Sequence, residues 1–171
     1  LERELGIDYW QDSSPQYAGA QMRVADSAGN VMLYWQGAMD EPGQSIDQRV
    51  KIPVWMDRFV ELGGNLQIAD AGVDGLEALA GTHDLVIVAA GKGEIGALFE
   101  RNPERSPLTS PQRVLALTYV NRFKPRPGTP AICININPGI GEFVSFPGLS
   151  LNGPCEIFTI ECIPGGPMDI W

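Results

Sequence analysis

Hydrophobic and polar residues alternate along several short stretches of the chain. The stretch "CININ" is the clearest, because Ile132, Ile134 and Ile136 fall on one face of a strand and the polar residues between them on the other. Between the first two strands, Gly29-Asn30 tolerates the positive φ of a tight turn, which predicts a β-hairpin. The predicted strands are residues 17–26, 30–37, 112–122, 131–137, 142–146 and 156–163.

One longer stretch follows the period of a helix. Residues 47–62 carry apolar side chains near helical spacing, and Pro53 stands in the first turns, where proline is tolerated. Gly63-Gly64 then ends the helix. The stretch "MDEPGQS" before the helix predicts a loop at residues 39–45. Shorter helical segments are predicted at residues 1–6 and 76–80.

A continuous apolar run rich in valine and isoleucine occupies residues 85–90, and it predicts a strand buried on both faces of a parallel sheet. A short strand is predicted before it, at residues 65–69, and the proline-rich loop "NPERSPLTSP" follows it. The chain therefore combines a mostly antiparallel sheet and helices with part of an α/β, Rossmann-like unit, which is an α+β fold. Because the chain begins without methionine inside a helix-like segment, we expect an internal fragment of a longer protein.

The apolar run leads into glycines at positions 91, 93 and 96, which have the spacing G-x-G-x-x-G. A dinucleotide fingerprint also needs an acidic residue at the end of a strand about 20 residues later, to hold a ribose. The corresponding stretch "SPLTSPQRVLAL" contains prolines and Arg113 but no such acid. Three interpretations stay open on spacing alone: a true fingerprint, a turn that needs small residues, and a late strand of a nucleotide-binding domain.

Composition and charge exclude several classes of function. The 171 residues carry a net charge of −9, which disfavours binding to nucleic acid. No apolar run approaches the roughly 20 residues that span a membrane. Three cysteines without a C-x-x-C pair indicate free thiols in a cytoplasmic protein, and His83 as the sole histidine disfavours a zinc site or a histidine-dependent hydrolase.

An ordered set of motifs carries a family resemblance. They are "SIDQRVKIP" leading to "ELGG", then "HDLVIVAAGKGEIGALFE", "SPLTSPQR", and "NPGIGE" with "FPGLSLNG". The chain resembles the FAD-dependent oxygenase component of styrene monooxygenase, in the p-hydroxybenzoate-hydroxylase-like flavoprotein family. The resemblance implies that residues 7–82 and 112–171, with the helix at 47–62, form a substrate-binding sheet region. It also implies that residues 83–100 form a strand and turn that return to the FAD-binding domain.

The resemblance further implies a two-component FAD-dependent monooxygenase. A flavin reductase component supplies reduced flavin, which reacts with O2, and the flavin hydroperoxide transfers one oxygen atom to a small apolar aromatic alkene. The cofactor is then the reagent, so we expect no catalytic residue in this chain and no activity from the fragment alone. Other parts of the same protein would supply the remaining FAD-binding segments, and a homodimer stays open.

Four residues match positions that face the cofactor in such proteins, namely Gln48, Arg49, Ala90 and Gly91. The family tends to have threonine where this chain has Ala90, which removes a hydroxyl group near the cofactor. For Arg49 the alternative is a surface helix arginine paired with Asp47 or Glu41.

Four further residues are candidates for the substrate cavity: Tyr17, Ala20, Asn135 and Thr159. Tyr17 matches a pocket tyrosine, and an ordinary strand aromatic is its alternative. Ala18 and Ala20 replace an aromatic residue and a histidine, which would reshape the cavity, so the alkene need not be styrene. Asn135 and Thr159 are assigned because the opposite faces of their strands carry bulky aliphatic residues, with solvent-facing polar positions as the alternative.

Two other functions are compatible with the residues. The glycine spacing would suit a fragment of an NAD(P)-dependent oxidoreductase, and the acidic sheet without catalytic residues would suit a non-catalytic binding module.

Overall fold

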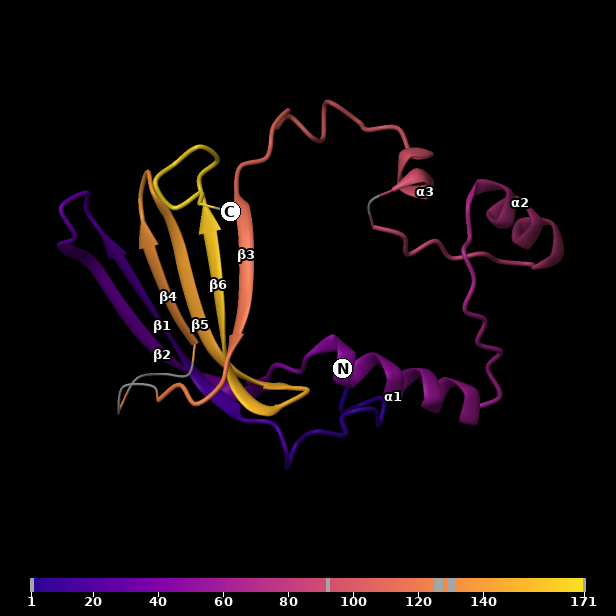
Figure 1. Ribbon diagram of the computed structural model, residues 1–171, viewed down its shortest axis with the longest axis horizontal. Coiled ribbons are helices and arrows are strands. Elements are labelled where there is room, and N and C mark those ends of the chain that lie inside the picture. The colour runs from indigo at the N-terminus through magenta and orange to yellow at the C-terminus, as the bar shows by residue number, and fades with distance from the viewer. Residues whose placement is uncertain (1, 92, 125–127, 129–131, 171) are drawn as a thin grey trace. The chain divides into compact units, whose positions relative to one another are not determined.

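Figure 1 shows the computed structural model, which describes residues 2–91, 93–124, 128 and 132–170. Six strands form one sheet in the order β2-β1-β4-β5-β6-β3. All neighbouring pairs are antiparallel except β1 and β4, which are parallel. This mixed sheet with few helices agrees with the α+β class. The strands are β1 (Gln16–Ala25), β2 (Val31–Gln44), β3 (Val114–Val120), β4 (Ile132–Asn137), β5 (Gly141–Ser150) and β6 (Gly153–Cys162).

The chain divides into two compact units. Residues 1–63 and 111–171 form the first, which we call the sheet unit because it holds the six described strands. Residues 64–110 form the second, which we call the insert unit. The first segment of the predicted substrate-binding region extends to residue 82, whereas the first segment of the sheet unit ends at residue 63.

Strand β2 differs from the prediction, because it continues through residues 39–44, where we expected a loop at 39–45. Pro42 and Gly43 are turn-forming residues, so composition alone indicated a break. However, β2 lies at the edge of the sheet, where a proline removes no hydrogen bond that a neighbouring strand needs. The register also shifts between Tyr17 and Gly19 on β1, which absorbs the irregularity.

Helix α1 (Gln48–Glu61) agrees with the predicted helix, and Asp47 caps its N-terminus. The segment before it is bonded to strand β5: the Asp47 amide donates to the Leu149 carbonyl at 2.9 Å, and the Leu149 amide donates to the Ser45 carbonyl at 2.8 Å. Further along, the Trp55 indole donates to the Ile7 carbonyl at 3.0 Å. The start of α1 is therefore held by the sheet.

The strand register sorts the side chains of the sheet onto two faces, because residues directly opposite one another share a face. One face, which we call the apolar face, carries a row that crosses all six strands. The residues of that row are Trp35, Met22, Ile134, Val144, Thr159 and Leu117. The other face is mixed: it carries Arg23 and Asn135 but also the aromatic pair Phe143 and Phe158, whose ring centroids are 5.3 Å apart.

Few side chains of the sheet unit are fully buried. Leu149, Cys155, Ile157 and Cys162 form a small core along the β5–β6 pair, and Trp10 is buried as well. The apolar face is less buried than this core, since Trp35 and Leu117 on it each keep 54% of their surface exposed. The sheet unit thus presents an open apolar surface.

The insert unit contains α2 (Val73–Thr82) and α3 (Glu94–Ala97), so the short helix predicted at 76–80 is present and longer than expected. Neither of the stretches predicted as strands, 65–69 and 85–90, forms a strand in this chain, and Ile87 is 82% exposed. A strand needs the backbone of a neighbour to pair with, and the described part of the insert unit offers none. The predicted helical end at 1–6 is a turn over its described residues, 2–6.

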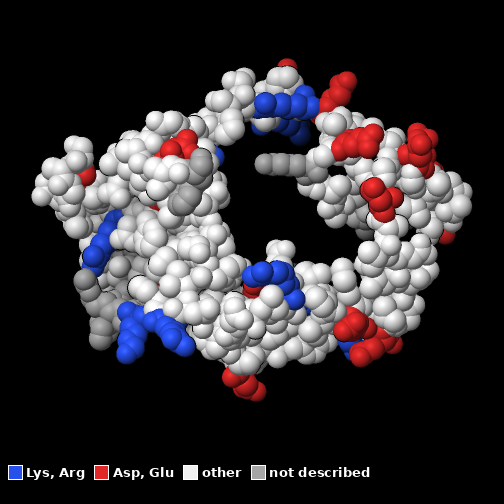
Figure 2. All heavy atoms as spheres, in the orientation of Figure 1, with Lys and Arg blue, Asp and Glu red and all other residues white. Residues whose placement is uncertain are grey.

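On the face drawn in Figure 2, Lys and Arg stand in separate groups with neutral surface between them. Among the described residues, no helix combines the length and the apolar character needed to cross a membrane. None of the described cysteines forms a disulfide.

Candidate functional site

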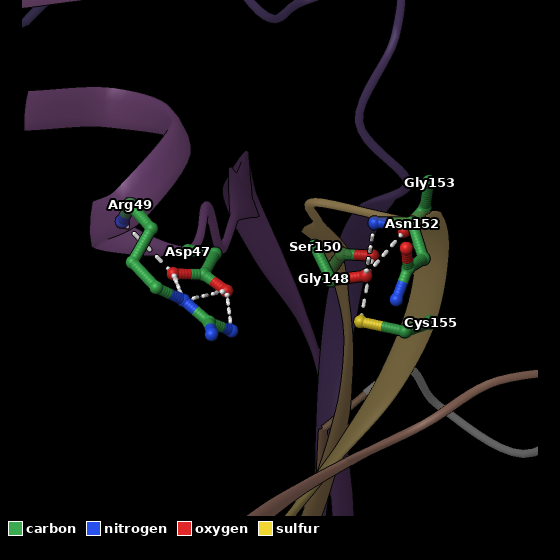
Figure 3. A network of polar contacts seen from close by, with 7 residues as sticks. All are labelled: Asp47, Arg49, Gly148, Ser150, Asn152, Gly153 and Cys155. Carbon is green, nitrogen blue, oxygen red and sulfur yellow. Dashed lines mark hydrogen bonds and ion pairs between the residues drawn. The ribbon is translucent and has the colours of Figure 1, made fainter. Parts of the chain in front are cut away.

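Asp47 and Arg49 form a multiply bonded polar pair at the start of α1 (Figure 3). The Arg49 backbone amide donates to Asp47 Oδ1 at 2.9 Å. Its side chain also donates to the carboxylate, from Nε at 3.1 and 3.2 Å and from Nη2 at 2.6 Å. One carboxylate therefore caps the helix and orients a guanidinium.

The two partners differ in their exposure to solvent. The Asp47 side chain is 4% exposed and the Arg49 side chain 65%. The hydrogen bonds from Arg49 hold the pKa of the Asp47 carboxyl below its ordinary value, although burial acts in the opposite direction. The same contacts raise the pKa of the Arg49 guanidinium. The pair consequently stays fully charged at neutral pH.

Tyr119 of strand β3 supplies a platform for the guanidinium. The Arg49 Cζ atom lies 5.9 Å from the centroid of the Tyr119 ring, within the range of a cation–π contact. Burial raises the pKa of the Tyr119 phenol, so the ring stays neutral at physiological pH. Sequence reasoning missed Tyr119, since only the register of β3 brings it to this helix.

Beside this pair, the β5–β6 turn is fixed by local hydrogen bonds (Figure 3). The Ser150 hydroxyl donates to the Gly153 carbonyl at 3.0 Å and accepts from the Asn152 amide at 3.2 Å. This turn directly follows Leu149, which binds the segment ahead of α1. Gln48, the first residue of the helix, is exposed.

The other two cofactor candidates, Ala90 and Gly91, are exposed residues of the insert unit. No atom lies within 4 Å of the point where a side chain of Gly91 would begin, so its backbone is open to approach. Gly93 has a φ of 121°, and a Cβ at Gly96 would stand 2.7 Å from the Gly91 carbonyl oxygen. These two glycines are thus required by the turn itself. Lys92 lies outside the described residues.

The four substrate candidates do not share one surface. Ala20 and Thr159 lie on the apolar face, but Asn135 lies on the other face, because it pairs with Phe143 and thereby with Ile160. The prediction that Asn135 and Thr159 face one cavity is therefore wrong for this sheet. The patterns of the separate strands could not show this, since the register between strands decides which faces coincide.

Tyr17 occupies a fixed position near the bulge of β1. Its ring lies over Gly43, where an added Cβ would come 2.4 Å from the ring. Its hydroxyl is 3.4 Å from the Ser45 hydroxyl. Gly43 is small here because the ring takes the space that a side chain would need.

The apolar face has a shallow part where Ala20 pairs with Gly37. The Trp35 indole lies against this part, 3.1 Å from where a Cβ of Gly37 would stand. The two tryptophans differ in burial, since Trp10 is 7% exposed and Trp35 is 54% exposed. Two small residues, Ala20 and Gly37, thus lie next to an exposed indole. The pattern of one strand does not show this, because only the pairing of β1 with β2 brings the two residues together.

Comparison with known proteins confirms the resemblance seen in the motifs. Residues 91–171 match the family described as "Styrene monooxygenase A putative substrate binding domain". The chain is also 28% identical over 172 residues to "Styrene monooxygenase StyA" of Pseudomonas fluorescens, and equally to the protein of that name from Pseudomonas sp. Both alignments cover 99% of this chain and 40% of the relative, so the chain spans about two fifths of the length of these relatives.

Proposed function

We propose that this chain is the substrate-binding portion of a two-component, FAD-dependent monooxygenase that epoxidises a small aromatic alkene. The observation that carries the proposal is similarity to styrene monooxygenases over 99% of the chain, together with the family match over residues 91–171. The six-stranded sheet with one open apolar face is the kind of wall that a small apolar substrate requires.

The residues assigned to the cofactor fit a flavin dinucleotide by their chemistry. Arg49 presents an exposed, permanently charged donor suited to a phosphate, and Gln48 is exposed beside it. The open backbone at Gly91, next to the exposed Ala90, suits close approach of a flat ligand. Bound FAD would supply the transfer of one oxygen atom from O2, after reduction by a separate flavin reductase.

We assign residues 83–100 to a strand and turn that complete a Rossmann-like FAD-binding unit. The stretch 85–90 is apolar and β-branched, yet its Leu85 and Ile87 are 76% and 82% exposed here. A strand of this composition is stable when neighbouring strands pair with it on both sides. The relatives are longer than this chain, and strands from such additional sequence would supply that pairing.

The apolar face would exclude water and orient the substrate. Ala20 and Thr159 lie on it within a surface that carries no charge along its central row, whose residues are given above. A dry environment protects a reactive oxygen-transferring centre from side reactions with water. Tyr17 would form a further part of the wall. Ala18 and Ala20 leave more room than the aromatic residue and histidine of the family pattern, so a substrate larger than styrene is admissible.

The test uses the full-length protein that carries this chain. We expect it to retain FAD and, with a flavin reductase and O2, to epoxidise styrene or a ring-substituted styrene. The isolated fragment should bind FAD weakly and show no activity. A full-length protein that retains no FAD, or that prefers a nicotinamide cofactor, would contradict the proposal.

A further inference from the structure

The Asp47 carboxylate makes more contacts than a helix cap needs. Capping uses one bond, from the Arg49 amide to Oδ1. The other three bonds go to the guanidinium and use both carboxylate oxygens. An ion pair in which both partners are exposed would contribute little, because holding two mobile side chains offsets the attraction. Here the acid is already immobile, at 4% exposure, so only the arginine is ordered by the contact.

The geometry also determines which part of Arg49 remains available. Nε and Nη2 face the carboxylate, and the Tyr119 ring lies 5.9 Å from Cζ. Nη1 has no hydrogen-bond partner among the described residues, and it stands apart from the dashed contacts in Figure 3. The carboxylate thus occupies the edge formed by Nε and Nη2, and the same contacts fix the direction of the Nη1 edge.

We propose that Asp47 is a positioning residue, which holds Arg49 so that its Nη1 edge is preset to receive a phosphate group of FAD. This inference rests on the proposed function, because it takes FAD as the ligand. Ordering a long side chain before the ligand arrives removes an entropy loss of the kind that weakens association. Tyr119 assists by supporting the guanidinium plane.

Two possible roles of Asp47, a source of negative charge and a support for Arg49, predict opposite changes in FAD affinity when its carboxylate is removed. If only net charge mattered, removing the carboxylate would strengthen binding of an anion, because Arg49 would no longer be partly neutralised. If positioning matters, removing it weakens binding because the guanidinium becomes mobile. Salt separates the two effects, since the Debye length falls from roughly 8 Å at 0.15 M to roughly 3 Å at 1 M ionic strength.

The decisive variant is Asp47→Asn, because asparagine caps a helix about as well as aspartate but cannot form the ion pair. In the full-length protein we expect FAD affinity to fall about three- to tenfold at high salt, as for one side chain that must be ordered on binding. The melting temperature should fall less than in Asp47→Ala, because the cap is kept. Asp47→Ala should lower both affinity and melting temperature, because the cap is lost as well.

The matched control is Glu61→Gln, which removes the carboxylate partner of Arg58 at the other end of the same helix. It should leave FAD affinity unchanged. For the platform, Tyr119→Phe keeps the ring and should behave like the parent, whereas Tyr119→Leu should weaken FAD binding. Riboflavin, which lacks phosphate, should bind all these variants equally.

A double-mutant cycle distinguishes positioning from a structural effect. With Arg49→Ala as background, Asp47→Asn should cause no further loss of FAD affinity. Equal or tighter FAD binding by Asp47→Asn at all salt concentrations would overturn the positioning role, even if Arg49→Ala weakens FAD binding. A full-length protein that binds no FAD would instead overturn the proposed function and this inference with it.

Discussion

The sheet unit and the insert unit both contain apolar, β-branched stretches, but only one of them builds a sheet. Strand β4 lies between β1 and β5, so its backbone pairs on both sides. Residues 85–90 are at least as apolar, yet they form no strand and lie largely exposed. The comparison teaches that β-propensity becomes structure only where a partner backbone is present.

Hydrogen exchange should show the largest difference between the two units. Amides of β5, which pair with β4 and β6, should exchange slowly, and those of residues 85–90 in this chain near the rate of an unfolded peptide. The rates should differ by roughly two orders of magnitude or more, since opening of a paired strand costs several kcal/mol. Measured by mass spectrometry on the full-length protein, residues 85–90 should become protected. If they stay unprotected there, the returning-strand assignment fails.

A glycine substitution should affect the two units very differently. A Cβ at Gly148 would meet Ile157 Cδ1 at 2.6 Å and the Ser45 carbonyl oxygen at 2.9 Å. Gly148→Ala should therefore destabilise the sheet unit by about 1–3 kcal/mol in denaturant unfolding. A Cβ at Gly91 in the insert unit would meet no atom within 4 Å. The free energy of unfolding of Gly91→Ala should therefore stay within about 0.5 kcal/mol of that of the parent. Equal effects at the two positions would contradict the packing described.

A stabilising change is expected in the insert unit. Gly81 lies in α2 with nothing within 4 Å of an added Cβ. Gly81→Ala should stabilise this helix by about 0.5–1 kcal/mol, because alanine loses less backbone entropy in a helix. Circular dichroism and backbone chemical shifts over residues 73–82 would measure the gain. A loss of helicity would indicate contacts at Gly81 that the structure does not contain.

The smallest expected difference between the two units concerns a buried acidic side chain, whose ionisation should make stability depend on pH. Glu156 of β6 is 7% exposed, and burial raises the pKa of its carboxyl. Ionisation therefore costs stability as pH rises from the unfolded value near 4.5 through the higher folded pKa. Glu156→Gln should raise the melting temperature at pH 7, and the gain should vanish below about pH 4.5.

The control for this effect is Glu77→Gln in α2, where the side chain is exposed and burial imposes no cost. Its melting temperature should follow that of the parent at both pH values. If Glu156→Gln lowers the melting temperature at pH 7, Glu156 has a favourable partner and the burial argument fails.

Much of the sheet unit could be predicted because its signals are local. Alternation in "CININ", the hairpin residues Gly29-Asn30 and the helical period of 47–62 each depend on neighbouring positions only. The motifs and their order along the chain also identified the resemblance to styrene monooxygenases. The capping residue Asp47 could be recognised from its type, but its ion pair was only one of two alternatives for Arg49.

The kind of elements, their approximate bounds and the family that they resemble follow from local patterns and from the order of the motifs. Three further features depend on how segments pack together: Asn135 and Thr159 lie on opposite faces, Tyr119 supports Arg49, and the run at 85–90 stays unpaired in this chain. The physical reason is the same in each case. Periodicity is a property of one segment, whereas register, stacking and strand pairing depend on a second segment whose position no local pattern encodes.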